Sequence, residues 1–279
     1  MYKLVIQAPE VATQDLKQLA KLTKAQQIDA IHPQAFKLLG ADPSTRRAVE
    51  DYCESAGLDF AFMPAEATLK DIGLVVMDMD STLITIECID EIADMLGVKA
   101  QVAAITERSM RGELDFPQSL RERVSLLAGL EESALERVYR ERLQLTPGAE
   151  KMLAAVHAAG GKSLLISGGF TFFTERLKAK LGLHYAVANT LEVRDGKLTG
   201  KVLGDIIDAQ SKADWLVRLR TELQLERLQT IAIGDGANDL KMLAKAGYGI
   251  AFHAKPIVRA QAAYAINHCG LDGLLAMFG

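Results

Sequence analysis

The chain has 279 residues, of which 49% are apolar and 24% charged, and its net charge is −4. This length allows one or two globular domains, and the small acidic excess disfavours nucleic acid and anionic membranes as partners. No apolar run reaches the roughly 18 residues of a membrane span, and the N-terminus turns polar too soon for a secretory signal. Three scattered cysteines are typical of reduced thiols, so the sequence predicts a cytoplasmic protein.

Residues 1–66 carry the signals of a small α+β unit. We expect four strands and two amphipathic helices there, in the order strand 2–7, helix 12–24, strand 25–32, strand 34–40, helix 44–56 and strand 58–63. This β-α-β-β-α-β order is that of the ferredoxin-like fold. The apolar strands predict an independent core for a first domain, and a linker near Pro64–Lys70 separates it from a second domain at 67–279.

The second domain shows strands separated by helices, a pattern typical of a parallel sheet wound on both faces. The continuous apolar run at 74–80 predicts a buried central strand, and similar runs predict strands at 162–167, 184–189, 229–235 and 247–252. Residues 191–202 predict a hairpin, because Asp195-Gly196 suits a turn that needs positive φ.

A long helical stretch interrupts this pattern between the first two core strands. Residues 88–145 contain apolar stripes at helical spacing, one of them made of Ile89, Ile92, Ala93 and Leu96. The stretch is too long for a simple crossover. We therefore expect a helical cap lobe at about 85–146, inserted in the core and lying over the edge of the sheet.

Polar clusters follow three of the expected core strands, at the position where wound α/β sheets bind ligands. Asp78 and Asp80 end the central strand, and residues two apart on a strand point the same way. Two carboxylates in one small space need a cation or must share a proton. A solvated turn that caps the next helix is the alternative, and a lone Asp-x-Asp would favour it.

The other two clusters are weaker when taken singly. Ser167-Gly168-Gly169 is expected to form a glycine turn whose hydroxyl and N–H groups could hold a phosphate oxygen, although turn geometry alone also explains it. Asp235, Asn238 and Asp239 lie in a glycine-containing loop after a later strand, where an Asx turn is the alternative. Lys212 opens a helix and would usually be a solvated surface lysine.

Together the clusters supply the oxygen ligands that Mg²⁺ prefers, and no histidine or cysteine cluster competes for a transition metal. DMDSTLI, SGG, Lys212 and GDGANDLKML resemble the four motifs of the haloacid dehalogenase-like phosphatases, in order and at suitable spacing, over residues 72–279. DMDSTLITIECIDE and FPQSLRERVSLL narrow the resemblance to members of that family that act on phosphoserine. The resemblance implies a Rossmann-like phosphatase core and a Mg²⁺-dependent hydrolase that releases serine and phosphate, the last step of serine biosynthesis.

The resemblance assigns a role to each motif residue. It implies that Asp78 is the nucleophile and forms an aspartyl phosphate, and that Asp80 is the general acid and base. Mg²⁺ would be held by Asp78, the backbone carbonyl of Asp80, and Asp235. Asp239 is expected to act only through its neighbours. The groups expected to bind or orient the phosphoryl oxygens are Ser167, the N–H of Gly168, Lys212 and Asn238.

Substrate specificity is expected to come from the cap. The resemblance implies that Glu87 receives the substrate ammonium, that Arg123 binds its carboxylate, and that Phe116 helps the cap to close and exclude water. Without the resemblance, the residue patterns favour ordinary roles, with Glu87 as a solvated first-turn acid, Arg123 as a surface cation and Phe116 as a core residue.

Three alternatives stay open at this point. A phosphotransferase uses the same covalent half-reaction and passes the phosphate to another hydroxyl. The core motifs also suit a phosphatase of different specificity, although Glu87 and Arg123 argue against it. An amino-acid sensor, suggested by residues 1–66, leaves the catalytic positions unexplained. The ligand of residues 1–66, regulation by serine, and the choice between a monomer and a homodimer are not determined by the sequence.

Overall fold

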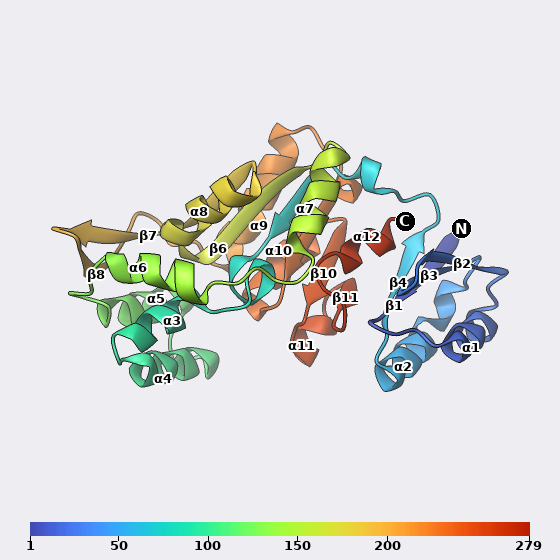
Figure 1. Cartoon of the computed structure of the whole chain (residues 1–279), viewed down its shortest axis with the longest axis horizontal. Coiled ribbons are helices and arrows are strands. Elements are labelled where there is room, and N and C mark those ends of the chain that lie inside the picture. Colours follow the sequence, from blue (N-terminus) through green and yellow to red (C-terminus); the bar gives the residue numbers. More distant parts are fainter.

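The computed structural model describes all 279 residues, and it contains two separate sheets (Figure 1). The N-terminal sheet and its helices comprise β1 (Tyr2–Gln7), α1 (Thr13–Thr23), β2 (Gln27–His32), β3 (Ala35–Leu39), α2 (Arg46–Ala56) and β4 (Asp59–Pro64). All strand pairs in this sheet are antiparallel, in the order β2-β3-β1-β4. The expected β-α-β-β-α-β arrangement is therefore confirmed.

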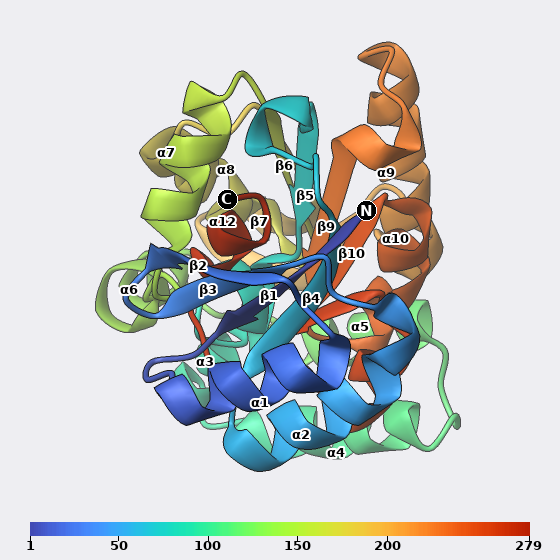
Figure 2. The same cartoon turned by 90° about the vertical axis from the view of Figure 1, so that its right-hand side faces the viewer.

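Both faces of the N-terminal sheet are covered. Successive residues of a strand point to opposite faces, so Leu4 and Ile6 pack with α1 and α2, while Val5 belongs to the main core of the molecule. Figure 2 shows the two helices on one side of this sheet, with the larger part of the protein behind it. Lys3 also donates a hydrogen bond to the carbonyl oxygen of Gly279 at 2.8 Å. The N-terminal sheet is thus packed directly against the C-terminal end of the chain.

The second sheet has seven strands in the order β11-β10-β9-β5-β6-β7-β8. Every pair is parallel except β7 with β8, and helices cover both faces (Figure 1). The chain order reverses at β5, the point at which sheets of this kind bind ligands. The expected doubly wound parallel sheet is confirmed. Its elements are β5 (Leu74–Met77), α7 (Ala149–Ala158), β6 (Lys162–Phe170), α8 (Thr171–Leu181), β7 (Tyr185–Arg194), β8 (Lys197–Leu203), α9 (Ala209–Glu222), β9 (Thr230–Gly234), α10 (Leu240–Lys245), β10 (Tyr248–Phe252), α11 (Pro256–Arg259), β11 (Tyr264–Ile266) and α12 (Gly273–Met277).

Four strands of the second sheet differ from the expected ones by more than one residue. β5 ends at Met77, so Asp78 and Asp80 lie in the turn after the strand and not on the expected strand 74–80, because the chain leaves the sheet there to enter the cap. β6 continues through Ser167-Gly168-Gly169, so the expected glycine turn is wrong, and the pairing of β6 with β7 shifts register there instead. β7 joins the expected core strand and the first arm of the hairpin in one continuous strand. β11 has no counterpart among the expected strands, because three residues are too short to show a periodic pattern.

Four α-helices lie between β5 and α7 in the chain, namely α3 (Cys88–Met95), α4 (Lys99–Met110), α5 (Phe116–Ser125) and α6 (Ser133–Arg137). They gather beside one end of the second sheet (Figure 1), and we call them the cap. The hairpin of β7 and β8 joins the cap, since the Gly129 N–H donates to the Leu198 carbonyl oxygen at 2.8 Å. No helix combines the length and the apolar character needed to cross a membrane.

Candidate active site

Asp78 directly follows β5, the central strand of the second sheet. Its side chain is almost fully buried, and both carboxylate oxygens have partners: Oδ1 accepts the Met79 N–H at 2.7 Å, and Oδ2 lies 2.7 Å from Lys212 Nζ. Burial and the nearby Asp239 carboxylate raise the pKa of Asp78 well above its ordinary value, against the opposing effect of Lys212. A carboxyl group with an adjacent cation is thus fixed at the ligand-binding end of the sheet.

The turn after Asp78 carries Asp80 toward the cap. Ser81 in this turn has a φ of 54°, a left-handed conformation that is uncommon for residues with a side chain. Asp80 Oδ1 accepts the Cys88 N–H at 3.1 Å, and Oδ2 lies so close to Gly169 that a Cβ there would come within 2.8 Å. Burial, followed by repulsion from the Glu87 carboxylate, raises the pKa of Asp80 to about 7. Near neutral pH this carboxyl group therefore populates both protonation states.

Lys212 lies in the first turn of α9, and only 1% of its surface is exposed. Its Nζ lies 2.7 Å from Asp78 Oδ2 and 2.8 Å from Asp239 Oδ1. Burial by itself would lower the pKa of Lys212, but the Asp239 and Asp78 carboxylates raise it above the usual lysine value. Lys212 is therefore not the solvated surface lysine that its position in the sequence would ordinarily indicate.

Asp235 and Asp239 follow β9 and form an acidic group with Asp78. One carboxylate oxygen from each of the three residues lies within 4.8 Å of the others. Asp235 Oδ1 accepts the Thr82 hydroxyl at 2.9 Å, and Asp239 Oδ2 accepts the Gly236 N–H at 3.0 Å. Burial and the Asp239 charge raise the pKa of Asp235 to about 6. Neighbouring strand ends thus bring three carboxyl groups to one point.

The acidic group of Asp78, Asp235 and Asp239 fits a divalent cation. Its three carboxylates have a single lysine between them, so the ionised group carries an excess of negative charge. That excess contributes to the raised pKa values of Asp78 and Asp235. Hard oxygen ligands of this kind suit Mg²⁺. The Asp80 carboxylate is outside this group, and the expectation that its backbone carbonyl binds the metal stays a prediction.

Strand β6 and the loop after β9 form a second wall of the cavity, with Ser167, Gly168 and Asn238. Ser167 Oγ accepts the Gly169 N–H at 2.8 Å, and the Asn189 side chain donates to the Gly168 carbonyl oxygen at 2.8 Å. A Cβ at Gly168 would come within 2.8 Å of a ring carbon of Phe116. Glycine at this position therefore lets the cap approach the sheet.

The cap supplies the opposite wall. Helix α5 begins with a capping box in which Asp115 Oδ1 accepts the Gln118 N–H at 2.7 Å. Phe116 and Arg123 are about two turns apart on this helix, so both face the cavity. Glu87 precedes α3 and accepts the Ser81 hydroxyl at 2.6 Å. The cavity between cap and sheet has a volume of about 380 Å³, enough for a small metabolite.

The residues selected from the sequence come together in space. Lys212 contacts Asp78, and the other residues selected from the sequence are among those that line the cavity, namely Asp78, Asp80, Glu87, Phe116, Arg123, Ser167, Gly168, Asp235 and Asn238. Asp239 contacts Lys212, in keeping with the expectation that it acts through its neighbours, whereas the sequence patterns assigned no role to Ser81 and Thr82. The spacing of Asp239 from Gly236 is that of a helix cap, so a turn was predictable, but no pattern indicates the contact with Lys212.

Comparisons with known proteins agree with this arrangement. Residues 75–244 match the family described as haloacid dehalogenase-like hydrolase, and residues 4–49 match a domain of unknown function. A phosphoserine phosphatase from Polaromonas sp. (strain JS666) is 50% identical over 228 residues, which cover 80% of this chain and 97% of that protein.

Solved structures are similar as well. The crystal structure of a probable phosphoserine phosphatase from Vibrio cholerae, in its unliganded form, gives a TM-score of 0.86 at 41% identity and covers 99% of this chain and 86% of that one. The structure of a phospho-aspartyl intermediate analogue of phosphoserine phosphatase gives a TM-score of 0.68 at 42% identity, covering 73% of this chain and 97% of that one.

Proposed function

The chain belongs to the haloacid dehalogenase-like hydrolases and, among them, to the phosphoserine phosphatases, and we propose that it hydrolyses O-phosphoserine to serine and phosphate with Mg²⁺ as cofactor. The observation that carries the proposal is one cavity that joins buried carboxyl groups at the sheet end to a cap wall with one carboxylate and one guanidinium. The phosphoserine phosphatase that is half identical to this chain supports the choice of substrate.

Asp78 is the proposed nucleophile. A carboxylate oxygen of Asp78 attacks phosphorus, a new O–P bond forms, and the bond between phosphorus and the serine oxygen breaks. Water then attacks the phosphorus of the aspartyl phosphate, which releases phosphate and restores Asp78. Lys212, at 2.7 Å, offsets the repulsion between the attacking carboxylate and the phosphate. The similar structure of a phospho-aspartyl intermediate analogue supports this covalent step.

Asp80 is the proposed general acid and base. In its protonated form it donates a proton to the departing serine oxygen, and as a carboxylate it then takes a proton from the attacking water. A pKa of about 7 suits both steps, because neither protonation state is costly to reach near neutral pH. The hydrogen bond from the Cys88 N–H leaves the other oxygen of Asp80 to face Gly169 and the cavity.

Asp78, Asp235 and the backbone carbonyl of Asp80 are the proposed Mg²⁺ ligands, and the bound ion supplies positive charge that offsets the charge of the phosphate and the carboxylates. Asp239 keeps Lys212 in place at 2.8 Å. The proposed contacts of the phosphoryl oxygens are Ser167, the N–H of Gly168, Lys212 and Asn238.

Two cap residues give the proposed specificity. Glu87 binds the ammonium group of phosphoserine and Arg123 its carboxylate, while Phe116 closes the cavity against the sheet. Burial lowers the pKa of Arg123, although the carboxylates of Asp90, Glu87 and Asp80 oppose this effect. Because serine is the product, we assign the reaction to the last step of serine biosynthesis, in the cytoplasm.

Phosphate release from a panel of phosphorylated metabolites tests the proposal. We expect fastest turnover with phosphoserine, slower turnover with phosphoethanolamine and 3-phosphoglycerate, which lack the carboxylate and the ammonium respectively, and loss of turnover in EDTA that Mg²⁺ reverses. Equal turnover of all three compounds would contradict the assigned specificity, and turnover that persists in EDTA would contradict the metal requirement. Adding alcohols as competing acceptors separates hydrolysis from transfer, since a transferase would form new phosphate esters.

A further inference from the structure

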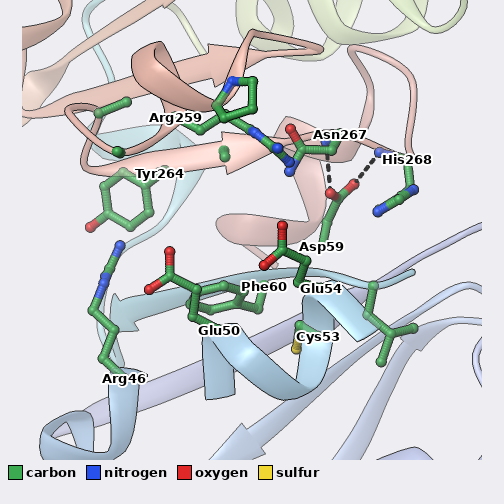
Figure 3. A pocket seen from close by; sticks show the side chains of 15 residues that line it. Arg46, Glu50, Cys53, Glu54, Asp59, Phe60, Arg259, Tyr264, Asn267 and His268 are labelled. Atoms are coloured by element: carbon green, nitrogen blue, oxygen red, sulfur yellow. Dashed lines mark hydrogen bonds between the residues drawn. The ribbon is translucent and has the colours of Figure 1, made fainter. Parts of the chain in front are cut away.

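A cleft of about 270 Å³ lies between the N-terminal part and the larger part of the protein (Figure 3). Helix α2 and strand β4 line it on one side, and helix α11 and strand β11 line it on the other. Glu50 and Glu54 of α2 lie on one side, and Arg259 lies on the other. Asp59, the first residue of β4, reaches across the inner end of this cleft to the segment after β11. Asp59 is therefore a buried polar contact between the two parts at this point, beside the more exposed Arg46, whose side chain donates to the Ala263 carbonyl oxygen at 2.7 Å.

Asp59 is 2% exposed and accepts hydrogen bonds from three successive backbone N–H groups. Its Oδ1 accepts from Asn267 at 2.6 Å, and its Oδ2 accepts from His268 and Cys269, both at 3.0 Å. Figure 3 shows the first two of these bonds. A carboxylate that receives consecutive N–H groups fixes their backbone tightly, because each bond is strengthened by its charge.

The segment that Asp59 holds is connected to the active site. Leu271, just beyond it, donates its N–H to the Pro147 carbonyl oxygen at 2.8 Å. The adjacent Thr146 donates its hydroxyl to the Thr82 carbonyl oxygen at 2.7 Å, and the Thr82 hydroxyl donates to Asp235 Oδ1 at 2.9 Å. Thr82 and Thr146 are both buried. A short series of hydrogen-bonded segments thus links β4 to the acidic group.

The same segments line a second, open cavity of about 420 Å³ that also borders Asp235. Cys269 and Gly270 line it on one side, and Thr146 and Pro147 on another. A Cβ at Gly270 would come within 2.5 Å of the Pro147 carbonyl oxygen, so the two segments are in close contact. A displacement of residues 267–271 would therefore move the support of Thr146 and, through it, of Thr82.

We propose that Asp59 is a positioning residue for Asp235, through which the N-terminal sheet adjusts the affinity of the acidic group for Mg²⁺. The inference rests on the proposed function, in which Asp235 is a metal ligand. Asp59 itself touches neither substrate nor the acidic group, and its effect passes through the 267–271 segment, Thr146 and Thr82. Substitutions along such a network alter coupling by amounts that correspond to about 2–30-fold in affinity.

Asp59→Asn tests the proposal, because the amide has the same shape but turns an NH₂ group toward the N–H donors. We expect calorimetry to show about 3–10-fold weaker Mg²⁺ binding, and we expect saturating Mg²⁺ to restore kcat. Glu54→Gln is the matched control, because it also removes one negative charge from this cleft. The Glu54 side chain makes no hydrogen bond to residues 267–269, whose N–H groups are bound by Asp59. Unchanged Mg²⁺ affinity in folded Asp59→Asn overturns the proposal, as does an equal loss in Glu54→Gln.

A second pair of variants tests the route. Thr146→Val removes the hydroxyl that binds the Thr82 carbonyl oxygen, far from the cleft, and should also weaken Mg²⁺ binding even where Asp59→Asn proves unstable. Asp59→Asn combined with Thr82→Val should weaken binding by less than the product of the single effects, because both act on the same support. Fully multiplicative effects, or a Thr146→Val variant with normal Mg²⁺ affinity, refute the route. A wild-type protein that binds no Mg²⁺ or leaves phosphoserine intact counts instead against the proposed function.

Discussion

Lys212 occupies an unusual position for a lysine, buried between the carboxylates of Asp78 and Asp239. When one partner of a buried ion pair is removed, the remaining charge stays buried without a counter-ion. This lowers the free energy of unfolding more than the loss of an exposed ion pair does. The same ammonium lies beside the proposed nucleophile. We therefore expect Lys212 to contribute both to the stability of the sheet end and to the proposed chemistry.

Lys212→Met keeps the apolar stem and removes the charge. We expect the free energy of unfolding, measured by urea denaturation without Mg²⁺, to fall by about 3–5 kcal/mol, because two carboxyl groups lose their cation. Lys241→Met is the control, because Lys241 is exposed on α10. We expect the free energy of unfolding of this variant to differ from that of the wild type by no more than about 0.5 kcal/mol. Equal stability of the two variants would show that Lys212 is not a structural counter-ion.

In the proposed function, the choice of substrate depends on Glu87 and Arg123. A hydrogen bond to a charged group contributes roughly 1.5–3 kcal/mol, so Arg123→Ala should lower kcat/KM for phosphoserine on the order of 10–100-fold. The same change should spare an aryl phosphate, which has no carboxylate. Glu87→Gln should likewise impair phosphoserine selectively. Equal losses on both substrates would assign the two residues to the closure of the cap rather than to recognition.

At the level of helices and strands, the topology of a wound sheet explains how much of the site was predictable. Asp78 and Asp235 each follow a parallel strand, and neighbouring parallel strands end at the same edge, so their proximity could be predicted from sequence. The Lys212–Asp239 contact joins a helix turn to a loop through side chains, and no periodic pattern encodes it. The extended path of Gly168 was also hidden, because packing of Phe116 and Asn189 overrides the usual preference of paired glycines for turns.

Two histidines join α7 to β6 and β7. His157 Nε2 lies 2.8 Å from Ser163 Oγ, His184 Nδ1 accepts the Ser163 N–H at 3.3 Å, and the two rings lie edge to face at 4.9 Å. Burial, and then the positive charge of Lys162, lowers the pKa of both rings. In the unfolded chain the pKa of a histidine is about 6.5. The unfolded chain therefore binds protons at these two histidines more readily than the folded protein does. The stability that this pair contributes is fully present above the pKa of histidine in the unfolded chain. It is lost as the pH falls toward the lower pKa values that the two rings have in the folded protein.

His184→Asn should accordingly reduce the pH dependence of Tm. Because the asparagine oxygen still accepts the Ser163 N–H but does not titrate, the fall in Tm between pH 7.5 and 5.5 should be smaller than in the wild type by roughly 1–2 °C, a modest value because the rings are half-exposed. His32→Asn, at an exposed position in the N-terminal sheet, is the control. A variant with the wild-type pH dependence would contradict this account of the pair.

In the whole molecule, the N-terminal part packs on the catalytic part through an apolar face of its sheet and through polar contacts of Lys3, Arg46 and Asp59. Val5, Ala35, Ala61 and Met63 belong to the main hydrophobic core, whereas the other face of the sheet has its own core with α1 and α2. The independence of residues 1–66 stays a prediction, and this packing predicts a cost to separating them. All proposed catalytic and binding residues nevertheless lie beyond residue 77.

The fragment of residues 67–279 should therefore keep the chemistry and lose stability. We expect kcat for phosphoserine at saturating Mg²⁺ to stay within about threefold of the full chain, because no group that touches the substrate is removed. Its Tm should be lower and its Mg²⁺ requirement higher, since the newly exposed apolar face and the loss of Asp59 both act against the native state. A folded, soluble fragment without measurable turnover at high Mg²⁺ would contradict the proposed division of the chain.

The most direct test of the central claim is to trap phosphate on Asp78. Rapid acid quenching of the enzyme during turnover of phosphate-labelled phosphoserine should give labelled protein that hydroxylamine releases, with the label in the peptide that contains Asp78. Asp78→Asn, which keeps the shape of the side chain, should fold and carry no label. Label that resists hydroxylamine, label on another residue, or rapid turnover without any protein-bound phosphate would contradict the aspartyl-phosphate mechanism.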